Sequence, residues 1–397
     1  MKQSNVLRLC VYLLAIAALV LLATAALREQ GPSFGPEGVQ TTVAPTLPPV
    51  KQPVALLRAG STRYQYEMLG TAERAAYDVI LAQLLSFPES VAVQGIDSEG
   101  LSAVFRALLL DQPLLFHVSS TAYKFNSADG KVTAFLPEYK MDAAEYAKRC
   151  DEVALVCAQI LAAVPQGAGE FEKELATHDA LVYLCTYDEK AGERSSVYGA
   201  LVERRASCEG YARAMLLLLE LQGMRVGVLT GDARNAEGVV GGHAWNKVCV
   251  DGQWYHLDAT WDDPIVEDEE TISHAYFNLR DEDVAASHDF DDTRTPCTAT
   301  DANYFVRKGL YFWALDQSAE QTMAVRLAES LDAGSAVLEL RMASQAALEQ
   351  ATDELFASKR VYAILAEANT SRRIRTDTVY RSEMKALRVI RIMPVLK

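Results

Sequence analysis

The sequence predicts an α+β protein in which a helix that begins near a cysteine packs on an antiparallel sheet. The segment 211–221 has the pattern of an apolar helix, which puts Cys208 at or near its N-terminus. Two strand-like segments, 248–250 and 254–257, flank the dipeptide Asp251-Gly252, a strong signal for a two-residue hairpin turn. A helix followed by a hairpin of this kind is typical of an α+β core.

The predicted helix gives Cys208 a chemically special position. Unpaired backbone N–H groups and the positive end of the helix dipole stabilise a thiolate at a helix N-terminus. The same N–H groups could hold an oxyanion after attack of the thiolate on a carbonyl. Gly210 keeps the first turn slim, so we expect it to let a substrate approach closely. Gly223 follows the apolar segment and is a plausible helix stop.

The hairpin turn fixes the register of the two strands. If Asp251-Gly252 form the loop, Val250 pairs with Gln253, and His243 then lies opposite Thr260. His243 and Asp258 become diagonal neighbours on one face, roughly 7–8 Å apart at the backbone. This register predicts that their side chains can meet. His256 shares the predicted face with Asp258 and is a rival for the same role.

Together these residues supply a thiol, a base and a carboxylate that orients the base, which is what a cysteine nucleophile needs. Singly, Cys208 could be a small core residue, His243 a satisfied strand histidine and Asp258 a turn residue; their order and geometry favour catalysis. Four further residues are candidates for substrate binding or oxyanion support: Tyr198, Gly210, Trp245 and Trp261. For the three aromatic residues, packing in the core is the alternative. His178, on a predicted helix, is expected to cap or pack.

These segments resemble the transglutaminase-like superfamily, in the form common in bacterial surface and secreted proteins. The resemblance covers residues 170–290 and rests on three uninterrupted blocks: Cys208-Glu209-Gly210-Tyr211-Ala212, His243-Ala244-Trp245-Asn246, and Trp254-Tyr255-His256-Leu257-Asp258-Ala259-Thr260-Trp261-Asp262. It implies a papain-like core with Cys208 as nucleophile, His243 as base and Asp258 as orienting residue. The family includes cross-linking transferases, peptidases, other amide hydrolases and inactive scaffolds.

The N-terminus predicts a membrane anchor. Residues 9–27 are apolar without a charge, and Lys2 and Arg8 precede them. A run of this length can cross a bilayer as a helix, and the positive flank predicts that residues 1–8 stay in the cytoplasm while the rest is exported. A cleaved signal peptide, with Ala23-Thr24-Ala25 as its cleavage site, is the alternative. The proline-containing segment 28–60 is expected to be an extended linker.

The remaining chain is long enough for two or three compact units. We predict an N-terminal α+β module at 61–165, the catalytic domain at 166–300 and a small C-terminal α/β module at 301–397. The expected helices are 71–87, 142–165, 170–186, 318–333 and 345–358, and the expected strands outside the hairpin are 114–119, 132–136, 335–342, 361–365 and 386–393. Ser318 and Gln321 form a possible capping box for the fourth helix.

Composition limits the partners. The net charge is −15 and no nucleic-acid motif is found, so nucleic acid is not an expected partner. The seven cysteines show no disulfide framework and no C-x-x-C signature. The acidic run at 262–270 could suggest calcium, but its spacing matches no EF-hand loop and such runs are usually solvated. We therefore expect no metal and no cofactor.

The sequence favours a single-pass, membrane-anchored enzyme whose catalytic part lies outside the cytoplasm, or a secreted one if the signal is cleaved. Its expected partners are the membrane and a peptide or protein substrate at the cell envelope. The expected reaction is cleavage of an amide through a Cys208 thioester. Protein-glutamine transamidation is the second hypothesis. A non-catalytic cell-envelope binding module that retains the fold is the third, and alkylation of an activated Cys208 would discriminate it from an enzyme.

Overall fold

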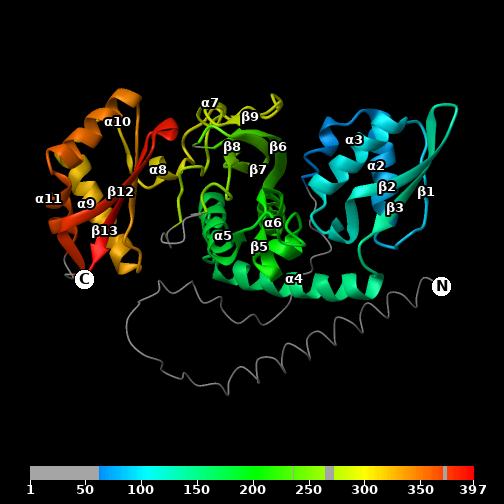
Figure 1. Ribbon diagram of the computed structural model, residues 1–397, viewed down its shortest axis with the longest axis horizontal. Coiled ribbons are helices and arrows are strands. Elements are labelled where there is room, and N and C mark those ends of the chain that lie inside the picture. The colour runs from blue at the N-terminus through cyan, green and yellow to red at the C-terminus, as the bar shows by residue number, and fades with distance from the viewer. Residues whose placement is uncertain (1–61, 236, 264–271, 370–372) are drawn as a thin grey trace, which may run out of the picture.

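The computed structural model describes residues 62–235, 237–263, 272–369 and 373–397. The predicted cytoplasmic tail, membrane span and linker lie outside these residues, as does most of the acidic run. In the part of the chain that is described, no helix combines the length and hydropathy needed to cross a bilayer. Figure 1 shows three modules in a row, with the module that carries Cys208 in the middle.

The N-terminal module packs two helices on a three-stranded antiparallel sheet of order β1-β3-β2. Its elements are η2 (Tyr66–Met68), α2 (Thr71–Leu84), β1 (Val91–Ala92), α3 (Ser98–Asp111), η3 (Leu115–His117), β2 (Val118–Ala128) and β3 (Lys131–Tyr139). Fully buried Tyr77, Ile80 and Leu101 of the helices contact Phe135 of the sheet in one core. The strand predicted at 114–119 is wrong over most of its length, because that segment is a 3₁₀ turn before β2.

The central module surrounds one buried helix. Its elements are α4 (Ala143–Ala163), α5 (Glu170–Leu184), β4 (Thr186–Tyr187), the π-turn η4 (Gly199–Glu203), β5 (Arg205–Ala206), α6 (Cys208–Glu220), β6 (Arg225–Arg234), β7 (Val240–Val250), β8 (Gln253–Leu257) and β9 (His288–Asp289). Every residue of α6 from Gly210 to Glu220 is buried. Apart from Arg213 and Glu220, the buried residues of α6 are apolar or small, as expected of a helix inside a protein, and α6 lies between α5 and the sheet.

The antiparallel sheet of the central module has the order β8-β7-β6-β9. Val250 pairs with Gln253, so the predicted hairpin register is confirmed. Asp251 and Gly252 have φ of 51° and 82°, the left-handed conformation that a type I′ hairpin turn requires. The predicted pairing of His243 with Thr260 does not form, because β8 ends at Leu257.

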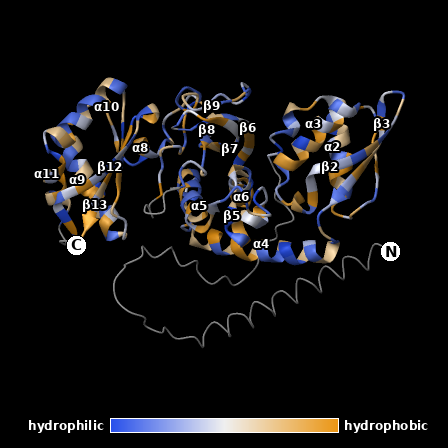
Figure 2. Ribbon diagram, in the orientation of Figure 1, coloured by the Kyte–Doolittle hydropathy of each residue, from blue (hydrophilic) through white to orange (hydrophobic). Residues whose placement is uncertain are grey.

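The long helix α4 contacts both the N-terminal and the central module. Val153, Cys157 and Ile160 are buried in the same core as α6. Figure 2 shows α4 apolar beneath α5 and β5 and hydrophilic toward its other end. Asp142 caps the helix by accepting from the backbone N–H groups of Ala144 and Glu145, as predicted from its position. Tyr146, near the start of α4, packs on Phe87 and His117 of the N-terminal module, so α4 joins the two modules, and the boundary at 165–166 stays a prediction.

The C-terminal module packs helices on a sheet of order β10-β11-β13-β12. The module and the loops that lead into it contain α7 (Asp281–Val284), α8 (Tyr304–Arg307), β10 (Tyr311–Phe312), α9 (Gln317–Asp332), β11 (Leu338–Met342), α10 (Gln345–Thr352), η5 (Asp353–Ala357), α11 (Val361–Ala368), β12 (Ile374–Met384), η6 (Lys385–Leu387) and β13 (Val389–Leu396). The strand predicted at 361–365 is wrong, because this segment starts helix α11. The cap of α9 is Asp316, whose carboxylate accepts from Ala319 N–H, and not the predicted Ser318.

Candidate active site

Cys208 is the first residue of α6, as predicted. The preceding Ser207 is the N-cap, with extended backbone, and its side chain makes no cap hydrogen bond. The first N–H groups of a helix have no acceptor within the helix, so those of Cys208 and Glu209 point toward whatever lies at this end. Cys208 is only partly buried, whereas the helix behind it is buried throughout. A rigid buried helix thus presents a thiol at the surface of the core.

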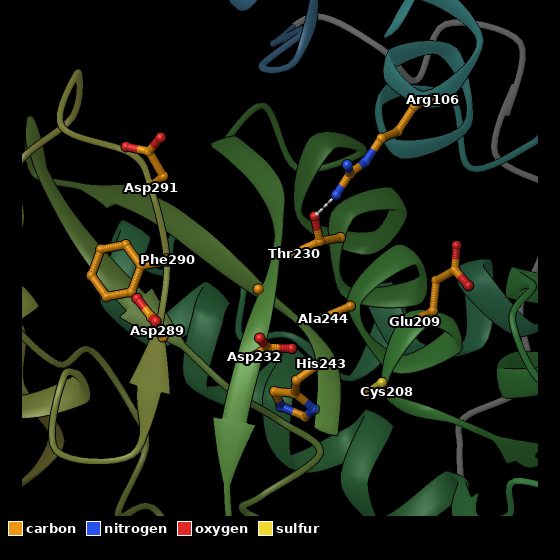
Figure 3. A pocket seen from close by; sticks show the side chains of 12 residues that line it. Arg106, Cys208, Glu209, Thr230, Asp232, His243, Ala244, Asp289, Phe290 and Asp291 are labelled. Carbon is orange, nitrogen blue, oxygen red and sulfur yellow. Dashed lines mark hydrogen bonds between the residues drawn. The ribbon is translucent and has the colours of Figure 1, made fainter. Parts of the chain in front are cut away.

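His243 and Asp258 meet as the hairpin register predicts. His243 lies on β7, Asp258 follows the end of β8, and His243 Nε2 lies 2.7 Å from Asp258 Oδ2. Because an ionised carboxylate only accepts hydrogen bonds, Nε2 carries the proton and Nδ1 is left for another partner. Figure 3 shows Cys208 beside His243 at one end of a cleft. The three side chains form a thiol–imidazole–carboxylate arrangement.

The electrostatics of this arrangement favour a charged imidazole. Burial lowers the pKa of His243, but the charge and hydrogen bond of Asp258, with a smaller contribution from the Cys208 thiol, outweigh it and raise the pKa to about 10. Burial would raise the pKa of Asp258, yet His243 and the nearby His288 hold it well below its usual range. An imidazolium at neutral pH is the partner that stabilises a thiolate and protonates a leaving group.

This raised pKa predicts a broad pH range of activity. The His243 proton persists up to about pH 10 in the folded protein, against an ordinary value of about 6.5. Its contribution to stability is complete below about pH 6.5 and is lost as the pH rises through about 10. We expect kcat/KM to fall at high pH with a midpoint near pH 10. In Asp258→Asn this midpoint should move to a lower pH, because the carboxylate that raises the His243 pKa is gone. A basic limb near pH 7 in the unmodified protein would contradict this assignment.

The cleft in front of Cys208 has a volume of about 670 Å³. It is lined by Arg106, Cys208, Glu209, Thr230, Gly231, Asp232, Gly242, His243, Ala244, Asp289, Phe290 and Asp291. Arg106 comes from α3 of the N-terminal module and donates to the Thr230 hydroxyl on β6, so two modules form the cleft. Four carboxylates and one guanidinium make the lining acidic, which favours cationic groups in a bound molecule.

Tyr198 lies elsewhere, contrary to its predicted role. Its hydroxyl donates to Glu152 at 2.8 Å, and Arg149 lies over its ring, so it faces α4. The tyrosine near the thiol is instead Tyr187 on β4. Burial, a hydrogen bond to Glu189 and the negative charge of Cys208 raise the Tyr187 pKa, which places the two side chains close together. Tyr198 is not among the residues that line the cleft, and its contacts are those of a residue packed on α4.

Gly210 also has a different role from the one predicted. A Cβ at this position would lie 2.3 Å from the carbonyl oxygen of Arg194 and 2.7 Å from the Ala206 Cβ. The glycine therefore admits the chain segment that precedes the helix, and not the substrate.

Replacement of Gly210 by Ala is expected to destabilise the protein by at least ~2 kcal/mol, because a backbone carbonyl cannot move aside as a flexible side chain can. Urea unfolding measures the change. Gly192→Ala is the matched control, since nothing lies within 4 Å of an added Cβ there. Equal stability of the two variants would show that the close packing at Gly210 does not matter.

Trp245 and Trp261 support the site from behind, and neither lines the cleft. Trp245 is 1% exposed, and its ring is stacked on His243 with centroids 5.9 Å apart. Trp261 is tilted against the imidazole with centroids 5.3 Å apart, and its backbone N–H donates to Asp258 Oδ1. The two rings hold the imidazole and exclude water behind it, which strengthens the interaction between His243 and Asp258.

The rival base His256 is placed away from the thiol. Its Nδ1 accepts from Trp245 Nε1 at 2.9 Å and its Nε2 lies 2.8 Å from Asp281 Oδ1. Burial lowers its pKa, unlike that of His243. His256 thus has a structural role, as does His178, which is fully buried against Asp179 and Asp262.

Two residues of the site were missed by the sequence analysis. His288 on β9 lies 3.0 Å from Asp258 Oδ2, and Arg106 enters the cleft from the N-terminal module. Neither lies in a recognisable motif, and only the sheet order β6-β9 and the packing of α3 bring them here.

Within the described residues, three side-chain groups have donor atoms close enough to hold a metal ion: His178–Asp179–His274, His243–Asp258–His288 and His256–Asp281–Cys297. In each group the imidazole nitrogens already meet carboxylates, so hydrogen bonds account for the arrangement. Of the predicted acidic run, Asp262 is buried, with its Oδ1 accepting from Tyr276 N–H, and is not solvated. Residues 264–270 lie outside the described residues.

Comparison with solved structures gives distant similarities. The chain is similar to a TGase (16% identity, 45% of this chain and 51% of that chain, TM-score 0.27). It is also similar to a proposed cysteine protease from Cytophaga hutchinsonii (14%, 35% and 61%, 0.24) and to the periplasmic domain of TgpA from Pseudomonas aeruginosa (16%, 36% and 66%, 0.18). The chain spans about half the length of the first of these. Similarities with TM-scores this low carry no inference about function.

No curated protein matches the chain significantly. Residues 159–259 match the model of the transglutaminase-like superfamily. This segment contains Cys208, His243 and Asp258, the three side chains that the structure brings together. The match covers about a quarter of the chain, and the similarity to this superfamily is therefore that of the segment that carries the candidate triad.

Proposed function

We propose that the protein is a cysteine-dependent amide hydrolase that acts on peptides or proteins. The observation that carries this proposal is the 2.7 Å contact of His243 with Asp258 in the same cleft as a thiol at a helix N-terminus. These groups supply a nucleophile, a proton carrier and an orienting carboxylate in one open site.

The first half of the proposed reaction acylates the enzyme. In the resting site the thiol proton lies on Nδ1 of His243, and the Cys208 thiolate attacks the amide carbonyl to form a C–S bond. Backbone N–H groups at the start of α6 face the developing oxyanion. The C–N bond then breaks as His243 returns the proton to the leaving amine. Asp258 keeps Nε2 protonated and stabilises the imidazolium throughout.

The second half releases the acyl group. A water molecule enters the cleft, His243 takes its proton, and the hydroxide attacks the thioester to give a carboxylic acid and free Cys208. Hydrolysis is preferred over transamidation because water is always present. The acidic lining, with Asp232, Asp289 and Asp291, favours substrates with a lysine or arginine near the cleaved bond.

A peptide-cleavage assay on the full-length protein tests the proposal. Peptides with a lysine flanking the scissile amide are incubated with and without a biotinylated primary amine, and products are identified by mass spectrometry. New carboxyl termini support hydrolysis. Exclusive incorporation of the amine would support transamidation instead. Absence of both, with an unreactive Cys208, would favour a non-catalytic binding module.

We also propose that the catalytic part lies outside the cytoplasm, anchored by residues 9–27. The support is the apolar run preceded by Lys2 and Arg8. Determination of the mature N-terminus is expected to place it near Met1, and protease added to intact cells is expected to remove the part beyond the linker. A mature N-terminus near Ala26 would instead mean cleavage and secretion.

A further inference from the structure

His288 is a buried histidine that the proposed reaction does not use. It lies on the short strand β9, where it pairs with Ala233 of β6, and its side chain is 0% exposed. Burial of a polar ring is costly unless both nitrogens find partners. The partners of His288 therefore indicate why it is there.

Both ring nitrogens have partners. His288 Nε2 lies 3.0 Å from Asp258 Oδ2, and Nδ1 lies 2.9 Å from the Ser287 hydroxyl. An ionised carboxylate only accepts, so Nε2–H is the donor to Asp258. His288 is thus a second imidazole donor to the carboxylate that orients His243.

With His288, every acceptor position of Asp258 is filled. Oδ1 accepts from the backbone N–H groups of Thr260 at 3.0 Å and Trp261 at 3.2 Å. Oδ2 accepts from His243 at 2.7 Å and from His288 at 3.0 Å. Four donors on two oxygens use the whole acceptor capacity of a carboxylate. The carboxylate can neither rotate nor bind water without losing one of them.

The His288 ring is itself fixed by aromatic neighbours. Trp261 packs against it with centroids 4.5 Å apart, and Trp245 meets it edge-on at 4.8 Å. Both tryptophans also contact His243. The two histidines are therefore held by the same pair of rings and compete for the same carboxylate oxygen.

We propose that His288 is a positioning residue of the catalytic site: it fixes Asp258 and shares its negative charge, so that His243 is oriented and not held too tightly as the imidazolium. This inference rests on the proposed function. It also links the triad to the cleft, because the three residues that follow on the chain, Asp289, Phe290 and Asp291, line it.

His288→Phe keeps a ring but removes the donor. Asp258 then interacts more strongly with His243, and we expect the pKa of His243 to rise by about one unit. A less fixed carboxylate and a weaker acid should lower kcat by about 10- to 100-fold with little change in KM. In His288→Gln the amide N–H can reach the position of Nε2, so kcat and the pKa of His243 should return to near their original values.

The decisive measurement is an NMR titration of the His243 imidazole in the full-length protein and both variants, alongside kcat and KM. His256→Phe is the matched control, since His256 is also buried and bound to a carboxylate, but to Asp281 and not Asp258. An upward shift in His288→Phe, reversed in His288→Gln and absent in His256→Phe, is the expected result.

The proposal is overturned if His288→Phe leaves the His243 titration unchanged, or if His288→Gln is as impaired as His288→Phe. A similar shift in His256→Phe would also overturn it, because any loss of packing would then suffice. The titration needs no substrate. If the unmodified protein cleaves no amide, the proposed function fails while the titration still decides whether His288 acts on His243 through Asp258.

Discussion

Cys208→Ala is expected to abolish amide cleavage while the fold is retained. The side chain lies at the start of a rigid buried helix, and the residues behind it hold the helix, so alanine removes only a partly buried sulfur. Without the thiol no C–S bond forms, and the remaining groups only position the substrate. The measurement is turnover of a cleavable peptide together with urea unfolding.

Cys249→Ala is the control for Cys208, because Cys249 is a buried thiol on β7 at the opposite end of the strand from His243. It should keep full turnover. If Cys208→Ala retained turnover and Cys249→Ala or Cys185→Ala lost it, the nucleophile would have been assigned to the wrong cysteine.

His243→Ala is expected to lower kcat by about 10²–10⁴-fold, the usual range for loss of a general acid–base. Its raised pKa, due to Asp258, is what makes it the proton carrier for both the thiol and the leaving amine. KM should change little, because the imidazole acts on the transition state. Steady-state kinetics at neutral pH give both numbers.

His256→Gln provides the contrast on the neighbouring strand. The structure binds His256 to Trp245 and Asp281, so its loss should affect stability more than turnover. If His256→Gln lost activity and His243→Ala kept it, the base would be His256 and not His243.

The triad was predictable because its signals are local. A left-handed two-residue turn at Asp251-Gly252 fixes the hairpin register as far as the Asn246–Leu257 pair, and Asp258 follows directly, so the register brings it near His243. The start of α6 at Cys208 was predictable because the apolar helical pattern of the sequence begins just after this residue. Each of these depends on a few neighbouring residues.

His288 and Arg106 were not predictable in the same way. His288 lies 30 residues beyond Asp258, and Arg106 lies 124 residues before Thr230. Their contacts depend on which strand becomes the neighbour of β6 and on how α3 packs on the sheet. Neither residue stands in a periodic pattern that would indicate such a partner.

The errors outside the site also have physical causes. The segment 361–365 is rich in β-branched and aromatic residues, but it continues into Ala366 to Ala368 and packs as α11 against α9. Strand β12 was missed because it lies at the sheet edge and is only partly buried, so it lacks the apolar alternation of a buried strand. In both segments the secondary structure is set by tertiary packing and not by the local residue pattern.

The rate of Cys208 alkylation against pH tests the central claim most directly. Cys150 is an internal standard in the same protein, since burial raises its pKa to about 11 and leaves it a thiol at neutral pH. Peptide mass spectrometry after brief iodoacetamide treatment measures both sites. We predict that Cys208 reacts far faster than Cys150 at neutral pH, and that His243→Ala removes this advantage. Alkylation of Cys208 that rises only above about pH 8, in parallel in both proteins, would contradict the thiolate–imidazolium pair on which the account rests.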